Sequence, residues 1–260
     1  MNMGINRKHL VIADTQCKPE HDLDYIKAIG KYIVAKRPDV IVHIGDHFDF
    51  PSLSSYDKGK KSFEGRRLVA DLEAGRKGME YLLAPLKKLQ AKQRAGKKKV
   101  YNPELVFCVG NHEARADRFA NDNPEFEGFV GVKELGIEDF GWKVYPFLQP
   151  AVVDGISYVH FLANPFTGKP YGGNALSQLK NVGKSFVVGH KQLLDCAIRP
   201  TLNGDMQIGI VNGACYPFDE PYKGYQGNFH FRGVTMLHEV KDGFGCPMFV
   251  SLDYIMDKYK

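Results

Sequence analysis

Short apolar runs alternate with polar segments along the first part of the chain. Residues 9–13, 40–44 and 105–109 are apolar enough to predict three buried strands. Between the first two, apolar residues recur at helical spacing, with Asp22 as a candidate N-cap and Pro38 closing the segment. A strand, a helix and a strand in this order predict parallel strands whose carboxyl ends lie side by side, which is where open α/β sheets place their sites.

Residues 51–100 interrupt this alternation with a second helical pattern. Leucine and methionine recur at roughly helical spacing there, but Gly75, Gly78 and Pro85 are expected to weaken or kink the helix. An exposed turn is expected at 95–99. We therefore treat the chain as one domain, residues 1–260, with a helical insertion at about 51–100.

The second half of the chain predicts further short elements. Helices are expected at 114–119 and 175–179, and the period-two pattern of 156–161 predicts a strand. Other strands are expected at 142–145, 151–153 and 185–188, followed by a tail of β-hairpins at 207–211, 233–240 and 247–252. The fold class is therefore α/β.

The composition indicates a cellular compartment and shows that charge is unevenly distributed along the chain. The five cysteines are odd in number and scattered, which favours free thiols in a reducing cytoplasm over a disulfide framework. We expect neither a signal peptide nor a membrane span. The net charge is +5, yet residues 58–99 hold 14 basic and 4 acidic residues and so carry +10. This basic segment is either a nucleic-acid contact or a solvated helix face rich in lysine.

Each of five apolar runs is followed by polar side chains. Carboxylate and amide oxygens combined with imidazole are typical of a site for divalent first-row metal ions. Two ions that share a carboxylate can activate a water molecule and hold a phosphoryl oxygen. The candidates in chain order are Asp14 with Gln16, Asp46 with Asp49, Asn111 with His112, His160, and His190 with Gln192.

These five stretches make the chain similar to the calcineurin-like metallophosphoesterase family, from Asp14 to about Gly213. The family pattern is D-x-H, G-D-x-x-D, G-N-H-[DE], a single His and G-H-x-H. The matching stretches here are 14–16, 45–49, 110–113, His160 and 189–192. The resemblance implies a four-layer α/β/β/α sandwich of two mixed sheets flanked by helices. The compact chain also resembles members that bacteriophages encode.

The resemblance further implies two divalent metal ions and a ligand set for each. Asp46 would bridge the ions, Asn111, His160 and His190 would complete one site, and Asp14, Gln16 and Gln192 the other. Both family histidines of the latter site are glutamine here. Because an amide oxygen is a harder and weaker donor than imidazole, we expect this site to be weak and to favour Mn²⁺ or Mg²⁺ over Zn²⁺. For the pair of ions Mn²⁺ is favoured, with Mg²⁺, Zn²⁺ or iron as alternatives. The competing interpretation is that this site stays empty.

By the same resemblance, His112 stabilises the phosphoryl transition state or protonates the leaving oxygen, and Asp49 orients it. Arg115 and Arg118 follow on one helix face and could bind phosphate, although surface ion pairs with Glu113 or Glu125 are as plausible. The remaining histidines are expected to be non-ligands.

The expected function is metal-dependent hydrolysis of a phosphoester by attack of a metal-bound hydroxide. The basic residues at 58–99 favour a phosphodiester, in a nucleotide or nucleic acid. One alternative is a phosphomonoesterase or protein phosphatase of the same fold. Another is a catalytically inactive binding scaffold with a degenerate first metal site. Protein partners, oligomeric state and the physiological substrate are not specified by the sequence.

Overall fold

A computed structural model of the protein describes residues 6–220 and 223–260, and two mixed β-sheets form its centre. The six-stranded sheet has the order β11-β10-β1-β2-β3-β4, in which β1 to β4 are parallel and the β10–β11 hairpin joins antiparallel to β1. Its strands are β1 (Arg7–Ile12), β2 (Val40–His43), β3 (Glu104–Cys108), β4 (Lys143–Tyr145), β10 (Gly233–Lys241) and β11 (Phe244–Ser251).

The five-stranded sheet has the order β5-β6-β7-β9-β8. Its strands β6, β7 and β9 are parallel, and β5 and β8 pair antiparallel at the two edges. They are β5 (Ala151–Val153), β6 (Ile156–Tyr158), β7 (Phe186–Val188), β8 (Asp195–Pro200) and β9 (Met206–Val211).

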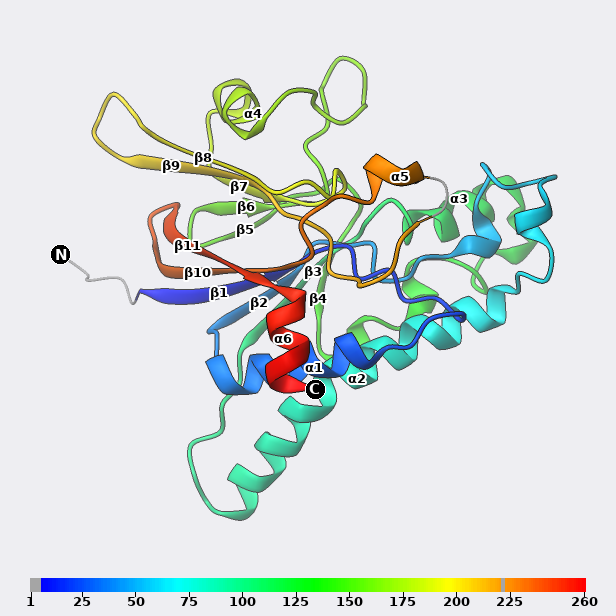
Figure 1. The fold of residues 1–260 in the computed structure, drawn as a ribbon, viewed down its shortest axis with the longest axis horizontal. Helices are drawn as coiled ribbons and strands as arrows, with labels where there is room; N and C mark the ends of the chain where they lie inside the picture. The colour runs from blue at the N-terminus through cyan, green and yellow to red at the C-terminus, as the bar shows by residue number, and fades with distance from the viewer. Residues whose placement is uncertain (1–5, 221–222) are drawn as a thin grey trace.

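The two sheets face each other and helices cover their outer faces (Figure 1). One apolar cluster joins β1, β2 and β3 to β5, β6, β7 and β9 and so fills the space between the sheets. A second cluster packs α1, α2 and α6 on the six-stranded sheet, and a third packs α4 on the other sheet. The helices are α1 (Asp24–Lys36), α2 (Leu68–Ala95), α3 (Ala114–Asp122), α4 (Ala175–Val182), α5 (Gly224–Gly227) and α6 (Leu252–Tyr259). The four-layer α/β/β/α prediction is confirmed.

Helix α2 corrects one expectation about the segment between β2 and β3. It runs without interruption through Gly75, Gly78 and Pro85. The glycines allow close packing, because a Cβ at Gly75 would lie 1.9 Å from the Phe48 ring and one at Gly78 would lie 2.5 Å from the sulfur of Cys17. The buried face of α2 belongs to the main core, which supports our proposal of a single domain.

Other elements differ from the predictions in their extent. Strand β6 ends at Tyr158, so His160 lies in the loop after it. Only β10 and β11 form the expected hairpin of the tail, whereas β9 pairs with β7 and β8 in the other sheet. Residues 252–259 form α6, which the sequence did not predict; Ser251 caps it by accepting a hydrogen bond from the backbone N–H of Tyr254. Within the described parts of the chain, every helix is too short or too polar to cross a membrane.

Short 3-10 helices complete the connections. They occupy Pro51–Leu53, Lys61–Phe63, Pro124–Phe126, Lys133–Leu135 and Glu138–Phe140.

Candidate metal centre

The loops after the strands carry an unusual backbone conformation. Five of the predicted metal ligands in these loops adopt a left-handed φ between 37° and 63°, although none is glycine: Asp14, Gln16, Asp46, His190 and Gln192. Such conformations cost on the order of 1–3 kcal/mol each and persist only where the surroundings impose them. Here adjacent loops hold each other, since the N–H groups of Asp14 and Gln16 donate to the carbonyls of Gly45 (3.1 Å) and Asp46 (2.9 Å).

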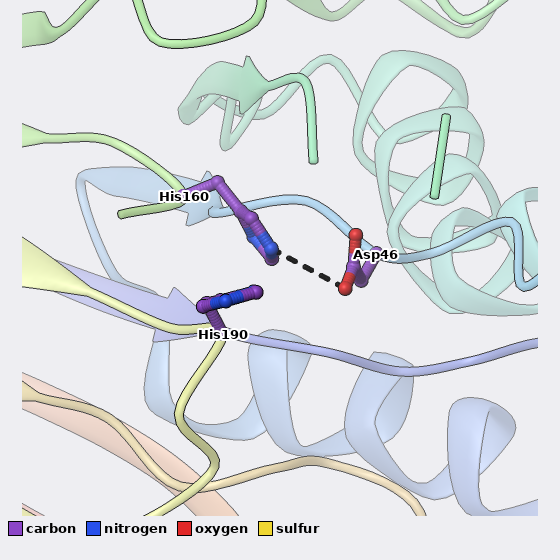
Figure 2. A group of neighbouring side chains, drawn as sticks. All are labelled: Asp46, His160 and His190. Carbon is purple, nitrogen blue, oxygen red and sulfur yellow. Dashed lines mark ion pairs between the residues drawn. The ribbon is translucent and has the colours of Figure 1, made fainter. Parts of the chain in front are cut away.

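Four side chains converge at the ends of β2, β3, β6 and β7. The Oδ1 of Asn111 lies 2.8 Å from both Nε2 of His160 and Nδ1 of His190. The Oδ2 of Asp46 lies 3.3 Å from Nε2 of His160 (Figure 2). Ligand atoms of Asp46, His160 and His190 all lie within 4.8 Å of one another. We refer to these four residues as the histidine site.

The ionisation of the histidine site follows from burial beside a carboxylate. Burial lowers the pKa of His160, but the charge and hydrogen bond of Asp46, the charge of Asp14 and the bond to Ile44 together raise that pKa to about 9. His190 is less favourably placed, because burial and the neighbouring charge of His160 lower its pKa to about 4. The Nδ1 of His160 donates to the carbonyl of Ile44 at 2.8 Å, which directs Nε2 into the site.

A second group, the glutamine site, consists of Asp14, Gln16 and Gln192. The Nε2 of Gln192 donates to Oδ2 of Asp14 at 2.8 Å, and the backbone N–H of His190 donates to Oδ1 of Asp14 at 3.3 Å. Burial and repulsion from Asp46 raise the pKa of Asp14 to about 6. The buried amide of Gln16 has no hydrogen-bond partner among the described residues.

The carboxylate of Glu113 holds the loop between the strands and the centre. Its Oε2 accepts the backbone N–H groups of Asp46 and Gly110, both at 2.9 Å. Its Oε1 accepts those of His47 at 2.6 Å and Phe48 at 2.9 Å. The side chain is fully buried. It therefore fixes the backbone beside Asp46 and does not form a surface ion pair.

His112 lies beside the histidine site and against Asp49. Its Nδ1 is 2.7 Å from the carbonyl oxygen and 2.8 Å from Oδ1 of Asp49, while its Nε2 is 3.7 Å from Oδ2 of Asp46. Burial lowers the pKa of His112, but the charge of Asp46 and the bond to Asp49 raise it above the usual value. Asp49 also lies 3.6 Å from the ammonium of Lys18, which in turn donates to Glu220 at 2.7 Å.

The two candidate phosphate-binding arginines have different surroundings. Arg115 donates to the carbonyls of Asp49 (2.8 Å) and Phe50 (3.2 Å), and its Nη2 is 3.1 Å from Nε2 of His112. Arg118 is exposed and donates to the carbonyl of Asn111 at 3.0 Å. No ion pair joins either arginine to an acidic side chain within residues 6–220 and 223–260.

The donors present suit a divalent cation at the histidine site. A carboxylate, an amide oxygen and two imidazole nitrogens form a mixed oxygen and nitrogen set that suits Mn²⁺, Zn²⁺ or iron. The glutamine site suits a cation less well, because the carbonyl oxygen of Gln192 accepts hydrogen bonds from Tyr216 (2.7 Å) and from Lys223.

Most of the site residues that the sequence nominated come together in the structure. The exceptions are the side chain of Gln16, which has no hydrogen-bond partner in the described part of the chain, and Arg118, which is exposed. The structure adds Lys18, Tyr216, Glu220 and Lys223. No motif marks these four positions. Lys18 was missed because it lies just outside the first motif. The other three were missed because they come from a segment far along the chain that folds back onto the centre. The structural role of Glu113 was also missed, although its place as the last residue of the 110–113 motif was a signal in the sequence.

Comparison with known proteins places these motifs in a family. The family model described as calcineurin-like phosphoesterase matches residues 8–200. Two similar proteins, each named Gene 54 protein, come from Mycobacterium phages D29 and L5. They are 27% and 28% identical over 191 residues, which is 72% of this chain and 69% of each relative. The expected likeness to phage proteins is confirmed.

Solved structures resemble the chain more distantly. A structure described as a novel archaeal phosphodiesterase is 10% identical, with a TM-score of 0.42. The match covers 94% of this chain and 99% of the archaeal chain. The Pseudomonas putida nuclease MPE is 14% identical, with a TM-score of 0.35, and covers 92% and 87% respectively.

Proposed function

The chain belongs to the calcineurin-like phosphoesterase family, whose members use divalent metal ions, and from this premise we propose that it hydrolyses a phosphodiester in a metal-dependent reaction. The observation that supports the proposal best is the histidine site beside the His112–Asp49 pair. A binding scaffold would have no chemical need for a buried histidine held by a carboxylate next to converging metal ligands.

We propose that Asp46, Asn111, His160 and His190 hold the firmly bound ion, with Mn²⁺ favoured. Asp14, Gln16 and Gln192 would form a weaker second site with Asp46. When bound, the ion supplies a Lewis acid that activates a water molecule and neutralises charge on a phosphoryl oxygen. Binding at His160 requires loss of the Nε2 proton, so the ion competes with protons there.

The protein's own residues then orient the substrate and move a proton. His112 donates from Nε2 to the leaving oxygen or hydrogen-bonds the phosphoryl group, while Asp49 holds Nδ1 and fixes the orientation of the ring. Arg115 donates to the carbonyls of Asp49 and Phe50 and thereby holds the segment that orients the ring of His112. Arg118, exposed in the middle of α3, is the better placed of the two arginines to contact a phosphate from solvent.

Hydrolysis of bis-p-nitrophenyl phosphate and p-nitrophenyl phosphate, each with Mn²⁺, Mg²⁺ and Zn²⁺, tests the proposal. We expect turnover of the diester, fastest with Mn²⁺. Preference for the monoester would identify a phosphomonoesterase or protein phosphatase instead. Absence of turnover with every ion would favour the inactive scaffold, for which the two glutamines and Lys223 are the specific support.

Nucleic acid is our proposed source of the diester, through the basic residues at 58–99. Lys97, Lys98 and Lys99 are all exposed at the end of α2. Their triple replacement by glutamine should weaken binding of a DNA duplex and reduce the slope of log K against log salt by up to about 3, close to 1 for each phosphate contact. An unchanged slope would mean that these lysines are solvated and do not contact nucleic acid.

We also propose a reducing, cytoplasmic environment. All five cysteines are free thiols, and three of them are fully buried or nearly so: Cys17, Cys108 and Cys215. Labelling of the exposed Cys246 in the native protein, with the buried thiols labelled only after denaturation, would support this assignment.

A further inference from the structure

The chain beyond the family match folds back onto the weaker half of the centre. The family model ends at residue 200, whereas residues 214–220 and 223–232 include side chains that contact the glutamine site. The backbone N–H of Cys215 donates to the carbonyl of Asp14 at 3.0 Å, and Ala214 forms a bridge with Arg232. These contacts place Tyr216 and Lys223 against Gln192.

Lys223 presents its ammonium to the side chain that replaces a family histidine. Its Nζ donates to Oε1 of Gln192 and, at 2.7 Å, to the hydroxyl of Tyr216. Tyr216 donates to the same Oε1 at 2.7 Å. Gln192 is thereby oriented, because an ammonium has only hydrogens to offer and the amide oxygen must face it. The amide NH₂ group consequently faces Asp14.

The charge of Lys223 offsets an excess of negative charge. Asp14 and Asp46 are both almost completely buried in this part of the centre, and each repels the other. A buried carboxylate pair needs a cation nearby. Burial lowers the pKa of Lys223, and the charges of Asp14 and Glu220 oppose this effect. Its ammonium occupies the one amide oxygen that Gln192 could offer to a metal ion.

We propose that Lys223 is a tethered cation that takes the place of the second metal ion, so that an ion can enter the glutamine site only by displacing it. The inference rests on the proposed function insofar as the histidine site must hold an ion. The protein would then work with one firmly bound metal ion and one ammonium group. Glutamine at positions 16 and 192 would suffice, because an ammonium group needs no imidazole ligand.

Mn²⁺ titration of the full chain by calorimetry, after removal of metal with EDTA, tests this proposal without measuring activity. We expect the natural protein to bind one ion tightly and a second one weakly or not at all. In Lys223→Gln the second ion should bind at least tenfold more tightly. Low-temperature electron paramagnetic resonance in excess Mn²⁺ should then show an exchange-coupled pair in Lys223→Gln and isolated ions in the natural protein.

Two further variants separate position from charge. Lys223→Arg retains a cation and should keep the second ion weak. Lys191→Gln removes the same charge from the neighbouring loop, where Lys191 donates to the carbonyl of Gly173, and should leave the second ion unchanged. Circular dichroism verifies that each variant folds.

The outcomes distinguish the inference from the proposed function. Equal affinity for two ions in the natural protein, or the same second-ion affinity in Lys223→Gln, would overturn the inference while leaving a metal-dependent phosphoesterase intact. Failure of the natural protein to bind any ion would overturn the proposed function as well.

Discussion

Replacing Glu113 by glutamine exchanges a single carboxylate oxygen for an NH₂ group, yet it should be among the most damaging changes in this chain. The two oxygens of Glu113 accept four backbone N–H groups, two each, at 2.6–2.9 Å. In glutamine one acceptor becomes a donor and faces two of those N–H groups. The site is buried, so water cannot satisfy them.

The magnitude follows from the two bonds that are lost. Hydrogen bonds to a charged group contribute about 1.5–3 kcal/mol each, which gives a loss of about 3–6 kcal/mol in the free energy of unfolding. For a chain of this size that loss lowers Tm by on the order of 10 °C. Burial and the charge of Asp46 raise the pKa of Glu113, but the backbone donors oppose this effect and favour the carboxylate.

Equilibrium urea unfolding in metal-free buffer measures this effect without any contribution from ion binding. Glu125→Gln is the matched control, because Glu125 is exposed in the short helix after α3 and the same charge is removed there. The control should lie within about 0.5 kcal/mol of the natural protein. A loss below about 1 kcal/mol in Glu113→Gln would refute the view that this carboxylate holds the loop.

Three further predictions concern catalysis, acid stability and packing. His112→Ala should lower kcat for the diester by about 10²–10⁴ with little change in KM, and steady-state kinetics showing an unaltered kcat would remove His112 from the mechanism. His9 is buried between Tyr158 and Asp154, and burial lowers its pKa, so its share of stability is complete above pH 6.5 and declines as the pH falls below that value. The difference in unfolding free energy between the natural protein and His9→Gln should therefore shrink from pH 7.5 to pH 5, and a constant or growing difference would contradict this assignment. Gly75→Ala should destabilise by about 1–3 kcal/mol in urea unfolding because its Cβ meets the Phe48 ring, whereas Gly172→Ala, which enters open space, should be neutral; a gain from helix propensity at Gly75 would disprove the clash.

The sequence predicted the helices and strands and the strand ends at which the site residues lie, but it did not predict the contacts between them. The hydrophobic pattern of a strand can be read from a single sequence, so the bounds of β1, β2, β3 and β7 were predicted to within two residues. Gly75 and Gly78 were misread because helix propensity is a local quantity, whereas their role is set by Phe48 and Cys17 from distant loops. Tertiary packing outweighs propensity there.

The candidate site divides in the same way. Motif spacing nominated its ligands, since short loops after parallel strands bring their residues to one edge. Lys223 carries no such signal, because a lysine in a polar stretch is ordinarily a solvated residue and only its contacts with Tyr216 and Gln192 make it part of the centre. The left-handed conformations of Asp14 and Asp46 are also invisible in the sequence, since neither position is a glycine.

The two halves of the centre are supported by different means, and this difference explains how one can be altered without loss of the other. The histidine site depends on Asn111 and Asp46, whose loops are fixed by Glu113 within the region that the family shares. The glutamine site depends on contacts from beyond residue 200, which lie outside that shared region. Because the carboxylate of Glu113 fixes the loops of Asp46 and Asn111 without involving side chains 16 and 192, we expect glutamine at those positions to leave the histidine site in place. In our proposal the ammonium of Lys223 supplies the positive charge that a second metal ion would otherwise bring, and we therefore expect the protein to be active with one bound ion.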